Sequence, residues 1–305
     1  MNGAVMGKYI FLILAVWAVV FFPSPADSSR FPVHLRDDVG TDVEIRSRPG
    51  RLVCLSPGAT EIIYALGEGG RLKAVCGLCD FPAEARHLPK TGDFLTVSAE
   101  AVMGARPDLV VATGGVQKEL VLRLRASRIP VLVLYPHSVR EIRGNILMLG
   151  RALGIEGRGR EAADDFDARI AAVSGRAGRI KPADRKRVYF EISPDPQMAA
   201  SDRGYVGELI SLAGGNNVVS GGSEEYPRIS PELVISRDPE VIILSHVTDS
   251  AEALRMLKAR RGWSIVSAVK NGRVYADFNM DLVMRPGPRV ADGLAMLNRR
   301  MYPRR

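Results

Sequence analysis

The chain has 305 residues, of which 46% are hydrophobic, and a formal charge of +8. This length and composition suit two ordinary folded domains and exclude a collagen-like, coiled-coil or disordered chain. A net positive charge of this size is compatible with binding to nucleic acid or to an anionic surface. The net charge therefore leaves the class of partner open.

Residues 1–27 have the pattern of a secretory signal peptide. Lys8 precedes the apolar run 9–22, and small residues follow up to Asp27. The run is short for a membrane span, so a cleaved signal is favoured over a retained anchor. No Cys follows at the junction, so no lipid-attachment site is expected there. We expect a soluble periplasmic protein, for which nucleic acid is not a partner.

The first lobe is predicted over residues 33–138. Residues 33–45 alternate around a Gly turn, as a hairpin does. Strands are expected at 52–55, 72–75, 109–112 and 131–134, and helices at 59–66 and 118–125, with residues 56–58 as a turn. Strands that alternate with helices indicate a parallel α/β sheet, because parallel neighbours need crossovers.

Residues 139–182 are predicted to form a helical connection that includes one long helix, since apolar residues recur there at helical spacing. The second lobe, residues 183–305, restarts the α/β pattern. We expect a strand at 187–192, a helix at 205–213, strands at 241–244 and 273–276, and a C-terminal helix at 290–301. The predicted fold class is α/β, with two parallel-sheet lobes joined by a single long helix.

A short phrase occurs once in each lobe. Residues 98–108 and 230–240 each place Glu two positions after Ser and end in Pro before an apolar run, and the second copy begins 132 residues after the first. Ser suits a helix N-cap, and a first-turn carboxylate faces the positive end of the helix dipole. Each copy is therefore predicted to be a short helix that leads into a buried strand.

The cysteines are Cys54, Cys76 and Cys79. In an oxidising compartment Cys76 and Cys79 could close a small disulfide ring, or they could stay unpaired in a loop. A redox-active C-x-x-C is less favoured, because the following Asp80 and Phe81 indicate a loop rather than a helix. Two cysteines are too few for a closed zinc site, and no metal site is expected.

No catalytic residue is predicted. The chain has no G-x-S-x-G, H-E-x-x-H or P-loop, and His34, His87, His137 and His246 have no metal-ligand spacing. Ligands of open parallel sheets bind beyond the carboxyl ends of the strands. We therefore expect a binding protein rather than an enzyme, with a cleft lined by the loops 56–60, 76–81, 113–116, 135–138, 193–201, 246–249 and 277–289.

The order of five motifs resembles the periplasmic substrate-binding proteins of cobalamin, haem and iron-siderophore ABC importers. These motifs are residues 37–40, 51–61, 79–82, 105–110 and 285–289. The resemblance covers residues 33–302. It implies a monomeric two-lobed receptor that delivers a small metal chelate to an ABC permease in the cytoplasmic membrane.

The resemblance also implies roles for particular residues. Glu100 and Glu232 match the positions that dock on the permease; the simpler interpretation is that they only compensate a helix dipole. Phe94 and Tyr226 match aromatic positions of the cobalamin-binding branch, although they could also merely anchor loops. Asp281 and Arg285 match polar contact positions. These four residues are the predicted ligand contacts, whereas Thr113 departs from the pattern, which has an aromatic residue there.

A corrinoid is the first expectation for the ligand, and no resident cofactor is expected. A haem receptor would need an axial ligand, for which Tyr135, His137 and His246 are candidates. A ferric siderophore would favour several Arg residues, here Arg203, Arg228 and Arg285. The rival classes are a secreted C-x-x-C redox enzyme and a signalling receptor without a permease.

Overall fold

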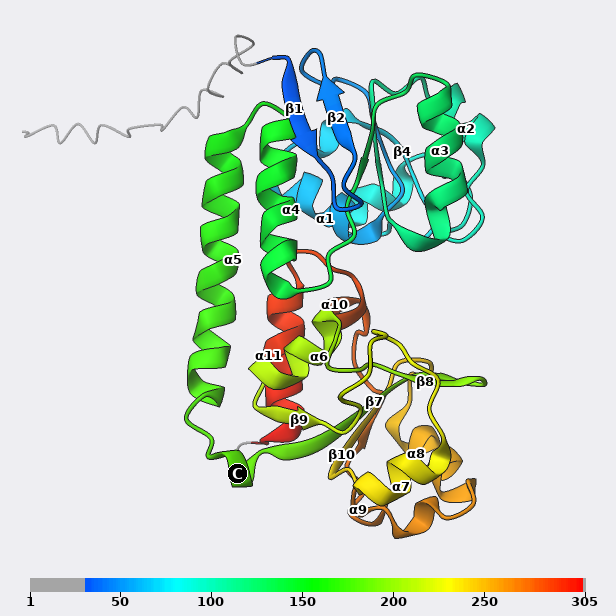
Figure 1. Cartoon of the computed structure of the whole chain (residues 1–305), viewed down its shortest axis with the longest axis vertical. Coiled ribbons are helices and arrows are strands. Elements are labelled where there is room, and N and C mark those ends of the chain that lie inside the picture. The colour runs from blue at the N-terminus through cyan, green and yellow to red at the C-terminus, as the bar shows by residue number, and fades with distance from the viewer. Residues whose placement is uncertain (1–30, 304–305) are drawn as a thin grey trace, which may run out of the picture.

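The computed structural model describes residues 31–303, so the expected signal peptide at residues 1–27 lies outside the described residues. Two α/β lobes lie at opposite ends of the molecule, and helices bridge them along one side (Figure 1). This arrangement confirms the predicted fold class. No helix within residues 31–303 is both long enough and apolar enough to span a bilayer.

The first lobe is built on a parallel sheet with the order β4-β3-β5-β6. Its central strands β3 and β5 are completely buried, as expected for a sheet covered on both faces. A separate antiparallel hairpin, β1-β2, confirms the alternation seen at residues 33–45. The elements are β1 (Val33–Arg36), β2 (Asp42–Ile45), β3 (Leu52–Cys54), α1 (Pro57–Ala65), β4 (Leu72–Val75), α2 (Ala99–Gly104), β5 (Leu109–Ala112), α3 (Lys118–Ala126) and β6 (Val131–Val133).

The second lobe repeats this strand order and adds one strand. Its parallel strands lie in the order β9-β7-β10-β11, and β8 pairs antiparallel with the far end of β7. The elements are β7 (Lys186–Pro194), β8 (Gln197–Ala199), α6 (Tyr205–Leu212), β9 (Gly215–Asn217), α7 (Pro231–Arg237), β10 (Val241–Leu244), α8 (Ser250–Ala259), α9 (Ser267–Lys270), β11 (Val274–Tyr275), α10 (Asp281–Met284) and α11 (Val290–Met301).

Both copies of the repeated phrase fold as predicted. The Ser98 side chain accepts a hydrogen bond from the Ala101 amide at the start of α2, and Ser230 accepts one from Leu233 at the start of α7. Each helix leads into a buried strand, β5 or β10. The phrase is therefore a helix-to-strand unit of the sheet, used once in each lobe.

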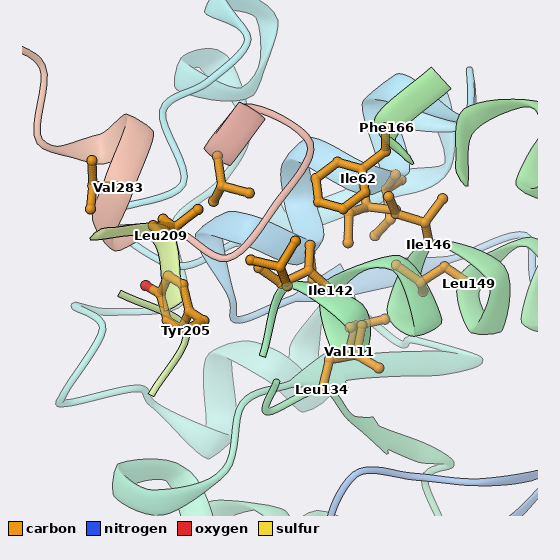
Figure 2. Close-up of a cluster of buried hydrophobic side chains, with 14 of the residues drawn as sticks. Ile62, Val111, Leu134, Ile142, Ile146, Leu149, Phe166, Tyr205, Leu209 and Val283 are labelled. Atoms are coloured by element: carbon orange, nitrogen blue, oxygen red, sulfur yellow. The ribbon is translucent and has the colours of Figure 1, made fainter. Parts of the chain in front are cut away.

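Helix α4 (Val139–Ala152) and the 22-residue helix α5 (Glu156–Ala177) form the connection. They lie side by side, and α5 runs from the level of the first lobe to that of the second (Figure 1). Ile62 of α1, Ile142 and Ile146 of α4, Phe166 of α5 and Leu209 of α6 belong to one buried cluster (Figure 2). Because this core is continuous between the lobes, the connection is a packed joint rather than a flexible linker.

The structure corrects two local predictions. Residues 56–58 are not a free turn, because α1 begins at Pro57 with Ser56 as its N-cap. Proline is well suited to the first helical position, where its missing N–H leaves no hydrogen bond unmade. The segment 277–289, expected to be a loop, contains α10. Strands β8 and β9 and helix α9 were not predicted, since they are short. Helix α8 was missed although Asp249 caps its start and Ala253 and Leu257 form a buried face.

Candidate functional site

A hollow of about 570 Å³ lies between residues of the two lobes. The first lobe contributes residues from the loop that follows β6, at the carboxyl end of the sheet. The second lobe contributes residues from the loops before α6 and α7. The lining residues are Tyr135, His137, Arg203, Ser223, Glu224, Glu225 and Tyr226.

Tyr135 and His137 form an aromatic pair at this hollow. Their rings lie edge to face at 4.7 Å between centroids, a favourable geometry for aromatic rings. The Tyr135 ring rests on the backbone of Gly114, where an added Cβ would come within 2.7 Å of it. The His137 Nδ1 atom is 2.5 Å from the Glu225 Oε1 atom. This hydrogen bond joins the first lobe directly to the second.

The first lobe also presents an apolar rim, which we define as Leu78, Leu95, Val116 and Tyr135. Their exposed fractions are 48%, 66%, 54% and 36%. Hydrogen bonds connect the loops that carry them, because the Gly77 amide donates to the Gly92 carbonyl and the Gln117 side chain donates to the Phe94 carbonyl. Tyr135 is the member of this rim that lines the hollow, beside His137 of the same lobe. The first lobe therefore presents two aromatic rings to the hollow, and the second lobe presents mostly charged side chains together with Ser223 and Tyr226.

Two of the predicted ligand contacts, Phe94 and Tyr226, lie in loops of different lobes. Tyr226 lines the hollow, and burial raises the pKa of its hydroxyl group, which hydrogen-bonds to Tyr205. Phe94 is half-buried and packs against the hydrophobic core. Both side chains are thus partly anchored, and their contact with a ligand stays a prediction.

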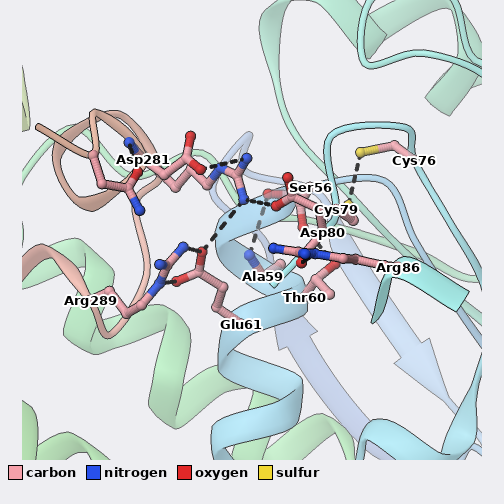
Figure 3. Close-up of polar contacts among 12 residues, drawn as sticks. Ser56, Ala59, Thr60, Glu61, Cys76, Cys79, Asp80, Arg86, Asp281 and Arg289 are labelled. Carbon is pink, nitrogen blue, oxygen red and sulfur yellow. Dashed lines mark hydrogen bonds and ion pairs between the residues drawn. The ribbon is translucent and has the colours of Figure 1, made fainter. Parts of the chain in front are cut away.

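Asp281 and Arg285, the other two predicted contacts, belong to an ion-pair cluster that joins the lobes (Figure 3). The Arg285 guanidinium lies 2.9 Å from the Asp281 carboxylate and 2.5 Å from that of Asp80, across the lobes. Arg289 binds both carboxylate oxygens of Glu61 in α1, at 2.5 and 2.9 Å. Burial raises the pKa of Glu61, and the hydrogen bonds from Arg289 oppose that shift. Only 11% of the Arg285 side chain is exposed.

Beside this cluster the segments 56–58 and 285–289 cross with almost no space between their backbones. A Cβ atom at Gly58 would lie 2.4 Å from the Pro286 carbonyl oxygen, and one at Gly287 would lie 2.9 Å from the Gly58 oxygen. The Phe81 ring lies under the Arg289 guanidinium at 3.6 Å from its centroid. We call this set of contacts the interlobe joint: Gly58, Glu61, Asp80, Phe81 and the segment 285–289.

Cys54, Cys76 and Cys79 are buried free thiols. The Cys76 and Cys79 sulfur atoms are 2.8 Å apart. The hydrogen bond from Cys79 lowers the pKa of Cys76, whereas burial raises the pKa of Cys79 and raises that of Cys54 to about 12. In residues 31–303 no group of three or more His, Cys, Asp or Glu side chains is arranged to hold a metal ion.

Sequence reasoning missed a buried network at the end of β7. The Glu191 carboxylate accepts two hydrogen bonds from Arg260, at 2.6 and 2.8 Å, and lies 2.9 Å from His246 Nε2. His246 is therefore held against Glu191 and is not among the residues that line the hollow. Only a Glu within a buried apolar strand could have indicated this network beforehand.

Glu100 and Glu232 occupy the first turns of α2 and α7, on different lobes and away from α5 (Figure 1). Both are exposed. The Glu100 carboxylate lies 2.6 Å from Arg123 of α3. Hydrogen bonds from its own amide, from Ser98 and from Arg123 lower the pKa of Glu100. Docking by either residue stays a prediction.

The fold and the hollow define a two-lobed α/β binding protein with a helical connection. The chain belongs to the periplasmic binding protein family, whose model matches residues 52–278. It is similar to the uncharacterized ABC transporter substrate-binding lipoprotein YvrC of Bacillus subtilis, with 29% identity over 97% of both chains.

Two solved structures share this fold. The vitamin B12-binding protein BtuF of Vibrio cholerae has a TM-score of 0.72 and 28% identity, over 83% of this chain and 97% of that one. The haem-binding protein RhuT of Roseiflexus sp. RS-1 has a TM-score of 0.73 and 29% identity, over the same fractions. Relatives of one fold are thus described with two different ligands.

The crossing at Gly58 gives a first prediction. Gly58→Ala should destabilise the protein by about 1–3 kcal/mol, because its methyl group cannot fit against the Pro286 carbonyl. The loss of stability is measured by thermal unfolding, monitored by circular dichroism. Gly144→Ala in α4 is the control, since a Cβ there meets nothing within 4 Å. Equal melting temperatures for the wild type and Gly58→Ala would contradict the crossing.

The Asp80–Arg285 pair gives a prediction about pH. Arg285 holds the pKa of Asp80 below its ordinary value of 3.8, so the pair stabilises the folded state above that pH and is lost as the pH falls through the folded-state pKa. Asp80→Asn should lower the melting temperature at pH 7 by at most about 4 °C, because Asp80 is partly exposed. Scans from pH 7 to 2.5 should show the difference disappear in acid; a constant difference would argue against the ion pair.

Proposed function

We propose that this chain is the substrate-binding protein of an ABC importer and that it holds a corrinoid in the hollow between its lobes. The observation that carries this proposal is the chemistry of the two walls. The Tyr135 ring of the first lobe suits the apolar face of a large ring, and the charged side chains of the second lobe, Arg203, Glu224 and Glu225, suit its polar substituents. A corrinoid has both an apolar ring face and polar amide substituents around the ring.

Similarity to relatives that are named vitamin B12-binding proteins supports a corrinoid as first candidate. Tyr226 offers an aromatic surface at the hollow, and Phe94 lies in the same loop as Leu95 of the rim. Asp281 and Arg285 are tied to Asp80, so we propose that they contact the ligand after a shift of that ion pair.

Haem is the second candidate, favoured by the position of Tyr135 and His137. Both line the hollow, whereas His246 is held by Glu191 and does not line it. Tyr135 could approach the metal of a bound ring directly, and His137 would have to leave Glu225 or use its other ring nitrogen, Nε2. For a ferric siderophore the Arg residues are less well gathered. Arg203 lines the hollow, but Arg285 is nearly buried in the interlobe joint.

Titration of the purified mature protein with cyanocobalamin, haemin and a ferric siderophore tests the ligand. We expect a corrinoid to bind with micromolar or tighter affinity by calorimetry. Tyr226→Ala should weaken binding at least about tenfold, the loss for removing a buried aromatic ring, while Tyr226→Phe should keep most of the affinity. Binding of haemin alone would replace the corrinoid by haem, and binding of none of the three would reject the proposed function.

We further propose that the chain works in the periplasm as a monomer and docks on its permease through Glu100 and Glu232. The two carboxylates lie on different lobes, so they would orient the receptor on a transporter built of two halves. Exposed ion pairs are individually weak, so they would act mainly on orientation and on the rate of encounter. Arg123 would have to release Glu100 when the permease binds.

Charge reversal tests docking separately from ligand binding. The double variant Glu100→Lys and Glu232→Lys should leave ligand affinity unchanged and abolish uptake in cells that express the permease. Glu161→Lys, on the exposed side of α5, is the matched control and should transport normally. Arg123→Ala should bind the permease at least as well as wild type. Full uptake by the double variant would remove both residues from the docking surface.

The competing classes have tests of their own. Ligand binding by the purified chain, together with uptake that is unchanged when the chain is deleted, would favour a signalling receptor. Catalytic reduction of insulin that is lost in Cys76→Ser would favour a C-x-x-C redox enzyme.

A further inference from the structure

Cys76 and Cys79 lie in one tight turn directly after β4. The Cys79 amide donates to the Cys76 carbonyl at 3.0 Å, and this turn brings the two sulfur atoms to 2.8 Å. A disulfide requires about 2.05 Å, so the sulfur atoms must approach by less than 1 Å. Gly77 and Leu78 close the turn, and the Gly77 amide is fixed by the Gly92 carbonyl.

The third thiol, Cys54, belongs to β3 and is not part of this turn. In the folded protein it donates to the Ser56 carbonyl at 3.3 Å, and burial raises its pKa to about 12, so it stays protonated and unreactive once the chain has folded. Cys76 is the more easily ionised member of the pair, because Cys79 donates a hydrogen bond to it. Cys54 therefore serves as an internal reference that is equally buried and stays reduced.

We propose that Cys76 and Cys79 form a disulfide while the chain folds outside the cytoplasm, and that burial then locks this bond into the interlobe joint. The oxidant is a small-molecule or protein disulfide. The inference rests on the export that belongs to the proposed function. The fold itself does not need the bond, since the thiols are already in place without it.

The exchange proceeds in two steps. The Cys76 thiolate attacks one sulfur of the oxidant, which forms a mixed disulfide and releases one thiolate. Cys79 then gives up its proton and attacks the Cys76 sulfur, which releases the second thiol. In sum, two protein thiols lose two protons and two electrons, and one disulfide gains them. In the folded protein both sulfur-bearing residues are almost completely inaccessible, at 0% and 1%, so the exchange has to come before the turn is buried.

The bond would act on the interlobe joint because the residues directly after Cys79 contact the other lobe. Asp80 binds Arg285, and Phe81 lies under Arg289. Lys90 binds the Cys79 carbonyl at 2.9 Å and so holds the turn from the other side. Closing the turn covalently restricts the segment that joins the first lobe to residues 285–289. Oxidation therefore stiffens the contact between the lobes.

Refolding in a defined redox buffer tests the bond without reference to any ligand. The mature chain is denatured, refolded with oxidised and reduced glutathione or with dithiothreitol, and its thiols are counted in denaturant. We expect one reactive thiol, Cys54, and a mass lower by about 2 Da after oxidising refolding, against three thiols after reducing refolding. The reduced form should melt about 5 °C lower and exchange amide hydrogens faster in peptides that contain residues 76–82 and 281–289.

Variants separate the pair from the third thiol. Cys54→Ser should leave no reactive thiol after oxidising refolding, and Cys76→Ser should leave two. Without denaturant, dithiothreitol should fail to reduce the folded disulfide form within hours. Three thiols in a natively folded chain after oxidising refolding would overturn the inference. A disulfide in a chain that binds no tetrapyrrole or siderophore would leave the inference standing and reject only the proposed function.

Discussion

The close crossing of two backbones at the interlobe joint is the constraint on which the rest of the structure depends. Gly58 lies in the first turn of α1, the first helix of one lobe, and Pro286 and Gly287 precede the last helix of the other, with no room for a side chain between them. The pairs Glu61–Arg289 and Asp80–Arg285 close this crossing on one side. Because the helices α4 and α5 share a continuous core with both lobes, the lobes have two fixed contacts rather than one. Large hinge motions are therefore disfavoured.

Rigidity of this kind limits how far the two walls of the hollow can rearrange around a bound molecule. If the hollow is the ligand site, as proposed above, its shape is already close to that of the ligand, and only local shifts such as that of the Asp80–Arg285 pair accompany binding. Two contacts fix the side chains that line the hollow. Tyr135 is packed on Gly114, and His137 is held by Glu225 from the opposite lobe. A receptor of this type recognises its ligand mainly by complementarity of preformed surfaces.

The architecture could be predicted from sequence further than the site could. The repeated phrase defined α2, β5, α7 and β10 because N-caps and buried strands are local signals. The interlobe joint could not be derived in this way. Its members come from residues 58–81 and 285–289, and no local pattern indicates that Gly58 touches Pro286 or that Arg285 reaches Asp80. The Glu191 network was missed for the same reason, since its partners are 55 and 69 residues away.

The two lobes share the strand order of their parallel sheets, yet the walls that face the hollow are unlike. Under the proposed function, a molecule bound in the hollow would therefore have one preferred orientation, with one side toward the Tyr135 and His137 rings and the other toward Arg203, Glu224 and Glu225. A transporter with two similar halves would then receive each molecule in a single orientation, set by the receptor before the two proteins meet.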